Sequence, residues 1–451
     1  MMTTTWLTRH DPFIICSDIG QDLKLTPTDC AYALWSRITE PDDDVASALI
    51  SHLGPLDSWQ WLREAGFTSC GQLRDTITIP PEMAEHTPRA QATITRRFRS
   101  WAPRIEAMDI RRELRTMVSL HGRVLTANHP HWPEGLSELN HPPLCLWVRG
   151  HSELLRGCSA RSLGACATPG EYDDGGTGEQ SSFSSPIVAM VGARACTRTG
   201  STIAEEIAEY LAGHNCIIMS GGAFGIDADA TVAALRHGPV IAVSAGGIDR
   251  YYPQAHREMF ERIIAQGLYV SEVPPGSVPA RHRFLSRNRL IAAISQATIV
   301  VEAAWRSGAL STAAHARNLG RHLGAVPGNV YSPSSAGCHK LLRDGATCIT
   351  NGPEALELVT PLTTPLDEQA QEMLPLSSLP ASSMREKLRQ PQSDECRIWE
   401  ALPLRRGAPI RSIAIAAGTS LDDTARVLSQ LCHEHYAALK QGLWRRGENT
   451  P

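Results

Sequence analysis

Two short apolar runs, each ending in a glycine turn, constrain the fold of this chain more than any other feature. Residues 187–191 lead into Gly192-Ala193-Arg194, and residues 216–219 lead into Ser220-Gly221-Gly222. A helix-like segment follows each turn. Strands that alternate with helices in this way form an open α/β sheet, whose strand ends border a ligand crevice. We therefore predict a crevice beside these two turns.

The chemistry of the turns favours a phosphate group in that crevice. Helix N-termini offer backbone N–H groups and the positive end of a dipole. Arg194 stands where the G-x-G-x-x-G pattern of dinucleotide-binding folds has a glycine, so we interpret it as a phosphate clamp or, less specifically, as a surface arginine that caps a loop. The glycines would allow an anion to approach closely because they lack a Cβ. The residues expected to line the crevice with Arg194 are Gly192, Ser220, Gly221, Gly222, Gly246 and Gly247, whereas Asp227 is expected to cap a helix.

The length, the net charge and the motifs of the chain limit the classes of function that it can have. A chain of 451 residues predicts two to four domains, and a formal net charge of -4 requires any nucleic-acid site to be a local basic patch. Twelve cysteines without C-x-x-C pairs, no secretory leader and no apolar run of membrane length predict a soluble cytoplasmic protein with reduced thiols. The common nucleophile, P-loop and zinc-protease motifs are missing, so we predict no catalytic residues, no metal and no cofactor.

Changes in composition and breaks at glycine and proline predict that the chain has four parts. Residues 1–118 form a helical N-terminal module of the SAM or helix-hairpin kind, broken at Gly54-Pro55, and residues 119–358 form an extended Rossmann-like domain with a doubly wound, mostly parallel sheet. Residues 157–185 are predicted to be a flexible insertion, and residues 359–392 a linker. Residues 393–451 favour a winged helix, with a three-helix dimerisation module as the alternative. The strand-like runs of the main domain are 187–191, 216–219, 240–244, 268–271, 298–301 and 323–326.

The densest signal for nucleic acid lies between residues 279 and 289. Four arginines and one histidine surround Phe284 there. Guanidinium groups neutralise phosphates and an exposed ring can stack a base, so this pattern favours single-stranded nucleic acid. The alternative is a helix start with Phe284 in the core and its arginines in solvent. The candidate residues from this stretch are Arg281, Phe284, Arg287, Asn288 and Arg289, and Ser307 and Gly308 precede a further helix that could hold an anion.

With these residues in view, the middle of the chain resembles the DNA-processing protein A family (DprA, also called Smf). The similarity covers about residues 120–355. It is carried by several short motifs in the family's order, which are Val191-Gly192-Ala193-Arg194, residues 220–227, Tyr252-Pro253, residues 271–276, residues 284–289, Val301-Glu302-Ala303, Ser307-Gly308 and residues 325–328.

This resemblance implies a Rossmann-like domain that binds single-stranded DNA, self-associates as a homodimer and helps load the RecA recombinase during natural transformation or recombination. It implies that Arg194 and Arg281 hold phosphates and that Phe284 stacks a base, while Arg287, Asn288 and Arg289 shape the pocket. Phe224, Thr231 and His256 depart from residues frequent in the family, which puts individual contacts nearby in doubt.

Two other functions stay open at this stage. Related Rossmann-like folds include phosphoribohydrolases, and such a nucleotide-acting enzyme would need Glu302 or another carboxylate beside the bound phosphate. Alternatively, the C-terminal unit could read duplex DNA as a regulator, using basic residues such as Arg411 and Arg445.

Overall fold

The computed structural model describes residues 10–68, 72, 74, 76–80, 88–156, 185–360, 388, 393–403, 407–440 and 442–447. The chain divides into two compact units, residues 1–364 and residues 365–451, and each is described by itself. Nearly all of the insertion predicted at 157–185 and of the linker predicted at 359–392 lies outside the described residues.

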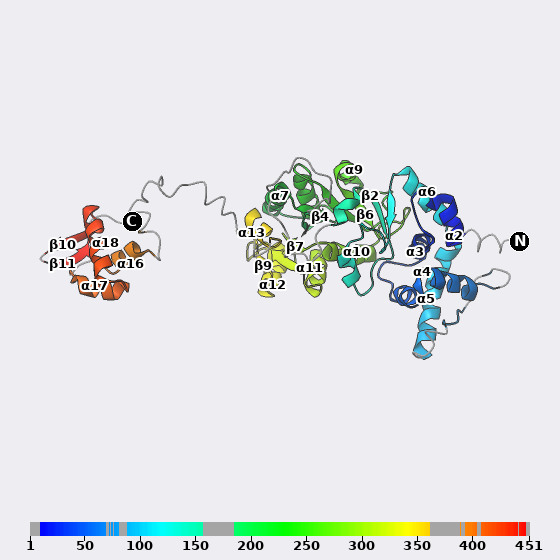
Figure 1. Ribbon diagram of the computed structural model, residues 1–451, viewed down its shortest axis with the longest axis horizontal. Helices are drawn as coiled ribbons and strands as arrows, with labels where there is room; N and C mark the ends of the chain where they lie inside the picture. The colour runs from blue at the N-terminus through cyan, green and yellow to red at the C-terminus, as the bar shows by residue number, and fades with distance from the viewer. Residues whose placement is uncertain are drawn as a thin grey trace, which may run out of the picture. The chain divides into compact units, whose positions relative to one another are not determined.

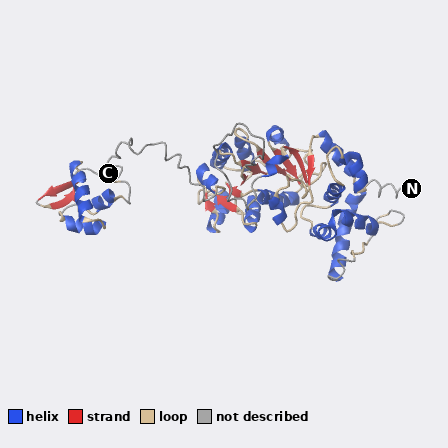
Figure 2. Cartoon of the chain, viewed as in Figure 1, coloured by secondary structure: helices blue, strands red, loops and turns tan. Residues whose placement is uncertain are grey.

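A nine-stranded sheet occupies the centre of the larger unit within the described residues (Figures 1 and 2). Its strand order is β1-β2-β6-β5-β4-β3-β7-β8-β9. Neighbours from β6 to β9 pair in parallel, whereas β2 pairs antiparallel with β1 and with β6. The strands are β1 (Arg123–Leu125), β2 (Leu146–Gly150), β3 (Ile187–Val191), β4 (Ile217–Ser220), β5 (Val240–Ser244), β6 (Leu268–Ser271), β7 (Ala297–Val300), β8 (His322–Ala325) and β9 (Thr347–Cys348). The predicted mostly parallel α/β sheet is confirmed, and three of the six predicted strands are displaced by one residue.

Helices cover both faces of this sheet because its strands are apolar on both sides. In β3, Val188 and Met190 face one apolar core, and Ile187, Ala189 and Val191 face the other. The first face carries α7 (Arg198–Gly213), α8 (Ile226–Ala234), α9 (Arg257–Gln266) and α13 (Gly352–Glu357). The second carries α10 (Arg281–Ile294), α11 (Ala309–Asn318) and α12 (Ala336–Arg343). Short helices η3 (Glu134–Glu138), η4 (Ser152–Arg156), η5 (Gln254–His256) and η6 (Pro333–Ser335) connect the larger elements.

The strand order reverses between β3 and β7. The chain runs from β3 outward through β4, β5 and β6, and it then returns to place β7 on the other side of β3. Connections on the two sides leave in opposite directions at this point, which opens a crevice at the carboxyl ends of the two strands. The fold therefore places Gly192 and Arg194, directly after β3, at the topological switch point.

The helical module packs against one end of the sheet domain. It comprises α2 (Pro12–Ile15), η1 (Cys16–Gly20), α3 (Pro27–Ile38), α4 (Asp44–Gly66), α5 (Pro88–Glu106) and α6 (Ile110–Ser119). The predicted break in α4 is present at Gly54, whose φ is 78°. Trp35 packs edge-on against Trp59 and Trp101 at centroid distances of 5.6 and 5.5 Å. This aromatic centre belongs to the same apolar core as the first face of the sheet.

The smaller unit has three helices and a hairpin among its described residues. They are α16 (Asp394–Glu400), α17 (Ile410–Ala417), α18 (Leu421–His433), β10 (Ala437–Lys440) and β11 (Leu443–Arg446). Gly418 ends α17 in the left-handed conformation, with a φ of 66°, which a glycine adopts without strain. This order of elements is the one expected for a winged helix, and the winged-helix assignment stays a prediction.

Candidate nucleic-acid interface

A cavity of about 770 Å³ lies at the switch point, beside the carboxyl end of β3. The turn after β3, the first half of α10 and the loop before α11 form its walls. The predicted residues that line it are Gly192, Arg194, Arg281, Phe284, Arg287, Asn288, Ser307 and Gly308. Residues that are far apart in the sequence therefore meet in one hollow. Other residues that line the cavity were not predicted as site residues, and they include Ala223, Asp227, Tyr252, Leu285, Arg306, Ser311 and Thr312.

A cation and two aromatic rings form the centre of this cavity. The guanidinium carbon of exposed Arg194 lies 5.1 Å from the centroid of the Phe284 ring, within the range of a cation–π contact. The ring of Tyr252 lies 5.5 Å from that of Phe284, centroid to centroid, and 48% of Tyr252 is exposed. The signal that could have found Tyr252 is its place in the loop after β5, five residues beyond Gly247.

The periodicity of α10 divides its residues between the cavity and the protein interior. Arg281, Phe284, Leu285 and Asn288 recur at helical spacing and line the cavity. Asn288 also anchors the opposite wall, because its Nδ2 donates to the carbonyl of Gly308 at 3.2 Å. The alternative interpretation of Phe284 as a core residue is therefore not what the structure has, since its ring lies at the cavity wall and is only partly buried.

Arg287 is a buried positive charge in the cavity wall. Its Nη1 donates to the carbonyl of Val243 at 2.8 Å. Burial lowers the pKa of its guanidinium, the charge of Arg194 lowers it further, and the charge of Asp227 opposes both. Burial likewise raises the pKa of the Asp227 carboxyl, against the effect of Arg287 and of backbone donors that include the N–H of Gly221. Asp227 thus braces the turn after β4. The expected helix cap is wrong, because Gly225 is the N-cap of α8 and no side chain caps that helix.

Six predicted site residues do not line the cavity, which corrects their expected place, and five of the six lie at the ends of β4 and β5. A Cβ on Gly221 would lie 1.9 Å from Nη1 of Arg287, and one on Gly222 would lie 2.6 Å from the Phe260 ring. Gly246 and Gly247 similarly make room for Pro279 and for the turn at residues 274–276. The hydroxyl of Ser220 donates to the carbonyl of Met190 at 2.8 Å. The space beside each of these four glycines is thus taken up by protein atoms.

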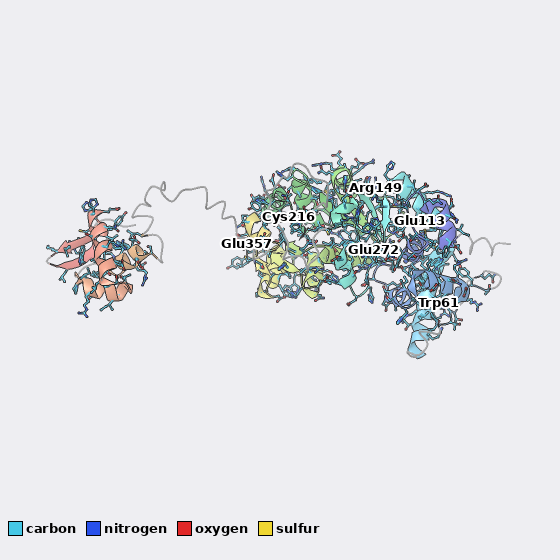
Figure 3. The ribbon with its side chains drawn as sticks, viewed as in Figure 1. Trp61, Glu113, Arg149, Cys216, Glu272 and Glu357 are labelled. Carbon is cyan, nitrogen blue, oxygen red and sulfur yellow. The ribbon has the colours of Figure 1, made fainter. Side chains whose placement is uncertain are left out.

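Arg289 is a second correction, because it lies away from the cavity. It is 3% exposed, and its Nη2 donates to Glu272 Oε1 at 2.6 Å. The carboxylate of Glu272, whose side chain is also largely buried, holds the Arg289 side chain away from the cavity. Glu272, labelled in Figure 3, lies next to the helical module, where its carbonyl accepts a hydrogen bond from Ser36.

Glu302 serves as an anchor for the start of α7. It is 5% exposed, and its Oε2 accepts hydrogen bonds from the backbone N–H and the hydroxyl of Thr197 at 3.0 and 2.9 Å. It is not among the residues that line the cavity. Glu302 therefore does not supply the carboxylate that the nucleotide-acting alternative requires, and the carboxylate that does line the cavity, that of Asp227, accepts a hydrogen bond from the N–H of Gly221.

The three departures from the family pattern also lie off the cavity wall. The ring of Phe224 packs edge-on against His256 at 4.6 Å between centroids. Thr231 is fully buried.

No residue group in the described part of the chain has the composition and spacing of a metal site. None of the described helices is both long and apolar enough to cross a bilayer.

The fold and this cavity define a Rossmann-like protein with a basic, aromatic crevice at its switch point. The family model of DNA recombination-mediator protein A matches residues 176–360. The DNA processing protein DprA of Mycobacterium tuberculosis strain H37Rv is 34% identical over 436 residues, which are 93% of this chain and 95% of that protein. DprA of Streptococcus pneumoniae strain R6 is 34% identical over 226 residues, covering 50% of this chain and 70% of that protein.

A solved structure agrees with these sequence matches. The X-ray structure of DprA from Streptococcus pneumoniae superposes with a TM-score of 0.51 and 26% identity, covering 74% of this chain and 98% of that one. The chain therefore belongs to the DNA recombination-mediator protein A family. Members of this family are DNA-processing recombination mediators and are not known enzymes, so the chain is a DNA-processing protein of recombination.

Proposed function

We propose that this chain binds single-stranded DNA in the cavity at the switch point and helps load the RecA recombinase onto that DNA. The process served is natural transformation or another form of recombination. The observation that carries the proposal is the contact between Arg194 and Phe284 at the cavity wall. It joins a phosphate-binding group to a base-stacking surface in one site.

The chemistry of the cavity suits a single strand better than a duplex or a dinucleotide. A ring can stack only on a base whose face is free, which a single strand offers and a duplex does not. Arg194, Arg281 and Arg306 are exposed arginines of the cavity wall, and guanidinium groups bind backbone phosphates without regard to sequence. We expect salt-sensitive binding with little sequence preference.

The partners follow from the proposed activity. We propose that RecA receives the strand from this protein, that the working form is a homodimer, and that it acts in the cytoplasm, where chromosomal DNA and the recombinase reside. Family membership supports these partners, and the cavity itself accounts only for the DNA.

Filament formation by RecA on single strands coated with single-strand-binding protein tests this function. The full chain should accelerate filament formation, and Arg194→Ala/Arg281→Ala should lose the acceleration because two of the three exposed arginines of the cavity wall are removed. Arg236→Ala is the matched control, since Arg236 is an exposed arginine outside the cavity. Equal acceleration by the double variant and by the control would overturn the assignment of the site.

A further inference from the structure

A second contact between a cation and an aromatic ring lies on the same edge of the sheet as the cavity. Nζ of Lys340 lies 5.5 Å from the centroid of the Trp305 ring. Trp305 comes after β7, and Lys340 is in α12, after β8. Because β3, β7 and β8 are neighbouring parallel strands, their carboxyl ends share one edge. The Trp305–Lys340 pair thus repeats, further along this edge, the chemistry of Arg194 and Phe284.

Large apolar side chains in the loops after β7 and β8 are unusually exposed. Trp305 is 59% exposed, Val330 76% and Tyr331 91%. Several exposed apolar side chains on one edge are typical of a binding site, whereas single exposed apolar residues are ordinary. Tyr331 lies in the loop after β8, so it belongs to the same edge of the sheet as Trp305.

The backbone under these rings is held by hydrogen bonds. The N–H of Gly337, at the start of α12, donates to the carbonyl of Ala303 at 2.7 Å. Nε2 of His339 lies 3.0 Å from the carbonyl oxygen of Gly328, and Asn329 Oδ1 accepts from the N–H of Tyr331 at 2.9 Å. These bonds connect α12 with the loops after β7 and β8. The rings are therefore presented from a fixed framework, which lowers the entropic cost of binding a flexible ligand.

Arg306 connects this surface with the cavity. It lines the cavity and is the residue directly after Trp305. We propose that a single DNA strand leaving the cavity continues over Arg306 onto Trp305 and Tyr331, where its bases stack, with Lys340 contacting a phosphate. This extension rests on the proposed function, and it assigns the strand a binding path longer than the cavity.

The charges on this surface favour nucleic acid over a protein partner. The centre of a protein interface is depleted of charge, whereas Lys340 contacts the ring of Trp305 and Arg306 is the next residue in the chain. A stacked base can take the place of the ammonium over the indole, and the freed cation then meets the adjoining phosphate. Single-strand-binding folds combine stacking rings with cations along the backbone in this way.

Binding of two oligothymidylates to the full chain tests the path. The lengths would be about 4 and about 16 nucleotides, the limits of site sizes for single-strand-binding folds. Trp305→Ala and Tyr331→Ala should each weaken binding of the long strand by about fivefold or more and leave binding of the short one unchanged. Trp305→Phe should retain most of the affinity. Phe13→Ala, which removes a ring 61% exposed in the helical module, should leave both affinities unchanged.

Each other outcome has a distinct meaning. Unchanged affinity of Trp305→Ala and Tyr331→Ala for the long strand overturns the path, even where Phe284→Ala still weakens both lengths. Loss of self-association in sedimentation, with DNA affinity intact, would assign the surface to a second copy of this chain and overturn the path as well. Absence of binding to either length by the unaltered chain would overturn the proposed function itself.

Discussion

The two sides of α10 use the same kind of residue for different purposes. On one side, exposed Arg281 and partly buried Phe284 line the cavity. On the other, Arg283 donates to Glu40 of the helical module at 2.8 and 2.9 Å, and Arg289 donates to Glu272 at 2.6 Å. A single arginine-rich run thus supplies both a ligand surface and the ion pairs that hold a fold together. The two sides differ in their acidic partners. An arginine of this run is structural where a carboxylate binds it, and it is available to DNA where none does, so the density of arginines alone does not identify a DNA site.

The largest expected effect comes from the interior side. Arg289→Met leaves the carboxylate of Glu272 buried without its main partner, which should lower the free energy of unfolding by about 3–5 kcal/mol. Denaturant unfolding measures this change. Arg289→Met/Glu272→Leu is the control, because removing both charges should restore most of the stability. Loss of DNA affinity by folded Arg289→Met without loss of stability would break the distinction between the two sides.

On the cavity side, Phe284→Ala should act on binding instead. Loss of a stacking ring should cost about 1–3 kcal/mol of affinity for single-stranded DNA, measured by fluorescence anisotropy. Phe284→Tyr keeps the ring and should bind nearly as well as the unaltered chain. A large fall in thermal stability with unchanged affinity would instead make Phe284 a structural residue.

The salt dependence of binding sharpens the same comparison. Arg194→Ala and Arg281→Ala should each flatten the plot of log affinity against log salt by about 0.7, the value for one neutralised phosphate of a single strand. Arg236→Ala should leave the slope unchanged, since that exposed residue lies off the cavity. If the plots of all three variants have the slope of the unaltered chain, neither Arg194 nor Arg281 neutralises a phosphate.

The smallest expected effect concerns the pH dependence of Glu40. Burial raises the pKa of its carboxyl, but Arg283, with further contributions from Arg104 and His282, outweighs burial and lowers the pKa from 4.5 to about 2. A depressed folded-state pKa stabilises the protein above the unfolded value, and this stabilisation is lost as the pH falls from about 4.5 towards 2. The stability difference between the unaltered chain and Glu40→Gln, about 1 kcal/mol at neutral pH, should shrink over that range. A constant difference from pH 7 to pH 2.5 would contradict the role of the carboxylate.

The sheet was predictable because its strands are buried on both faces. Such strands are continuous apolar runs with glycine turns at their ends, and the runs at 187–191, 240–244 and 268–271 match β3, β5 and β6 in full. The short strand β9, whose Thr347 and Cys348 are both exposed, carries no such signal. It forms because the chain returns to the edge of a sheet that already exists.

The site was only partly predictable. Arg194 and Phe284 were each identified from local chemistry, but their contact depends on the strand order, which brings the turn after β3 beside α10. Sequence does not show what fills the space beside a glycine, so Gly221 was expected to face an anion and faces Arg287. The place of Arg289 depends on its ion pair with Glu272, a residue after β6 that the strand order brings beside α10.

Titration of fluorescent oligothymidylate with the full chain tests the central claim, that the cavity at the switch point holds a single strand. The unaltered chain should bind at low salt, and Arg194→Ala/Arg281→Ala/Phe284→Ala should lose nearly all binding while it keeps its circular dichroism spectrum and thermal stability. Equal affinity of the two folded proteins would contradict the claim and place the DNA elsewhere on the molecule.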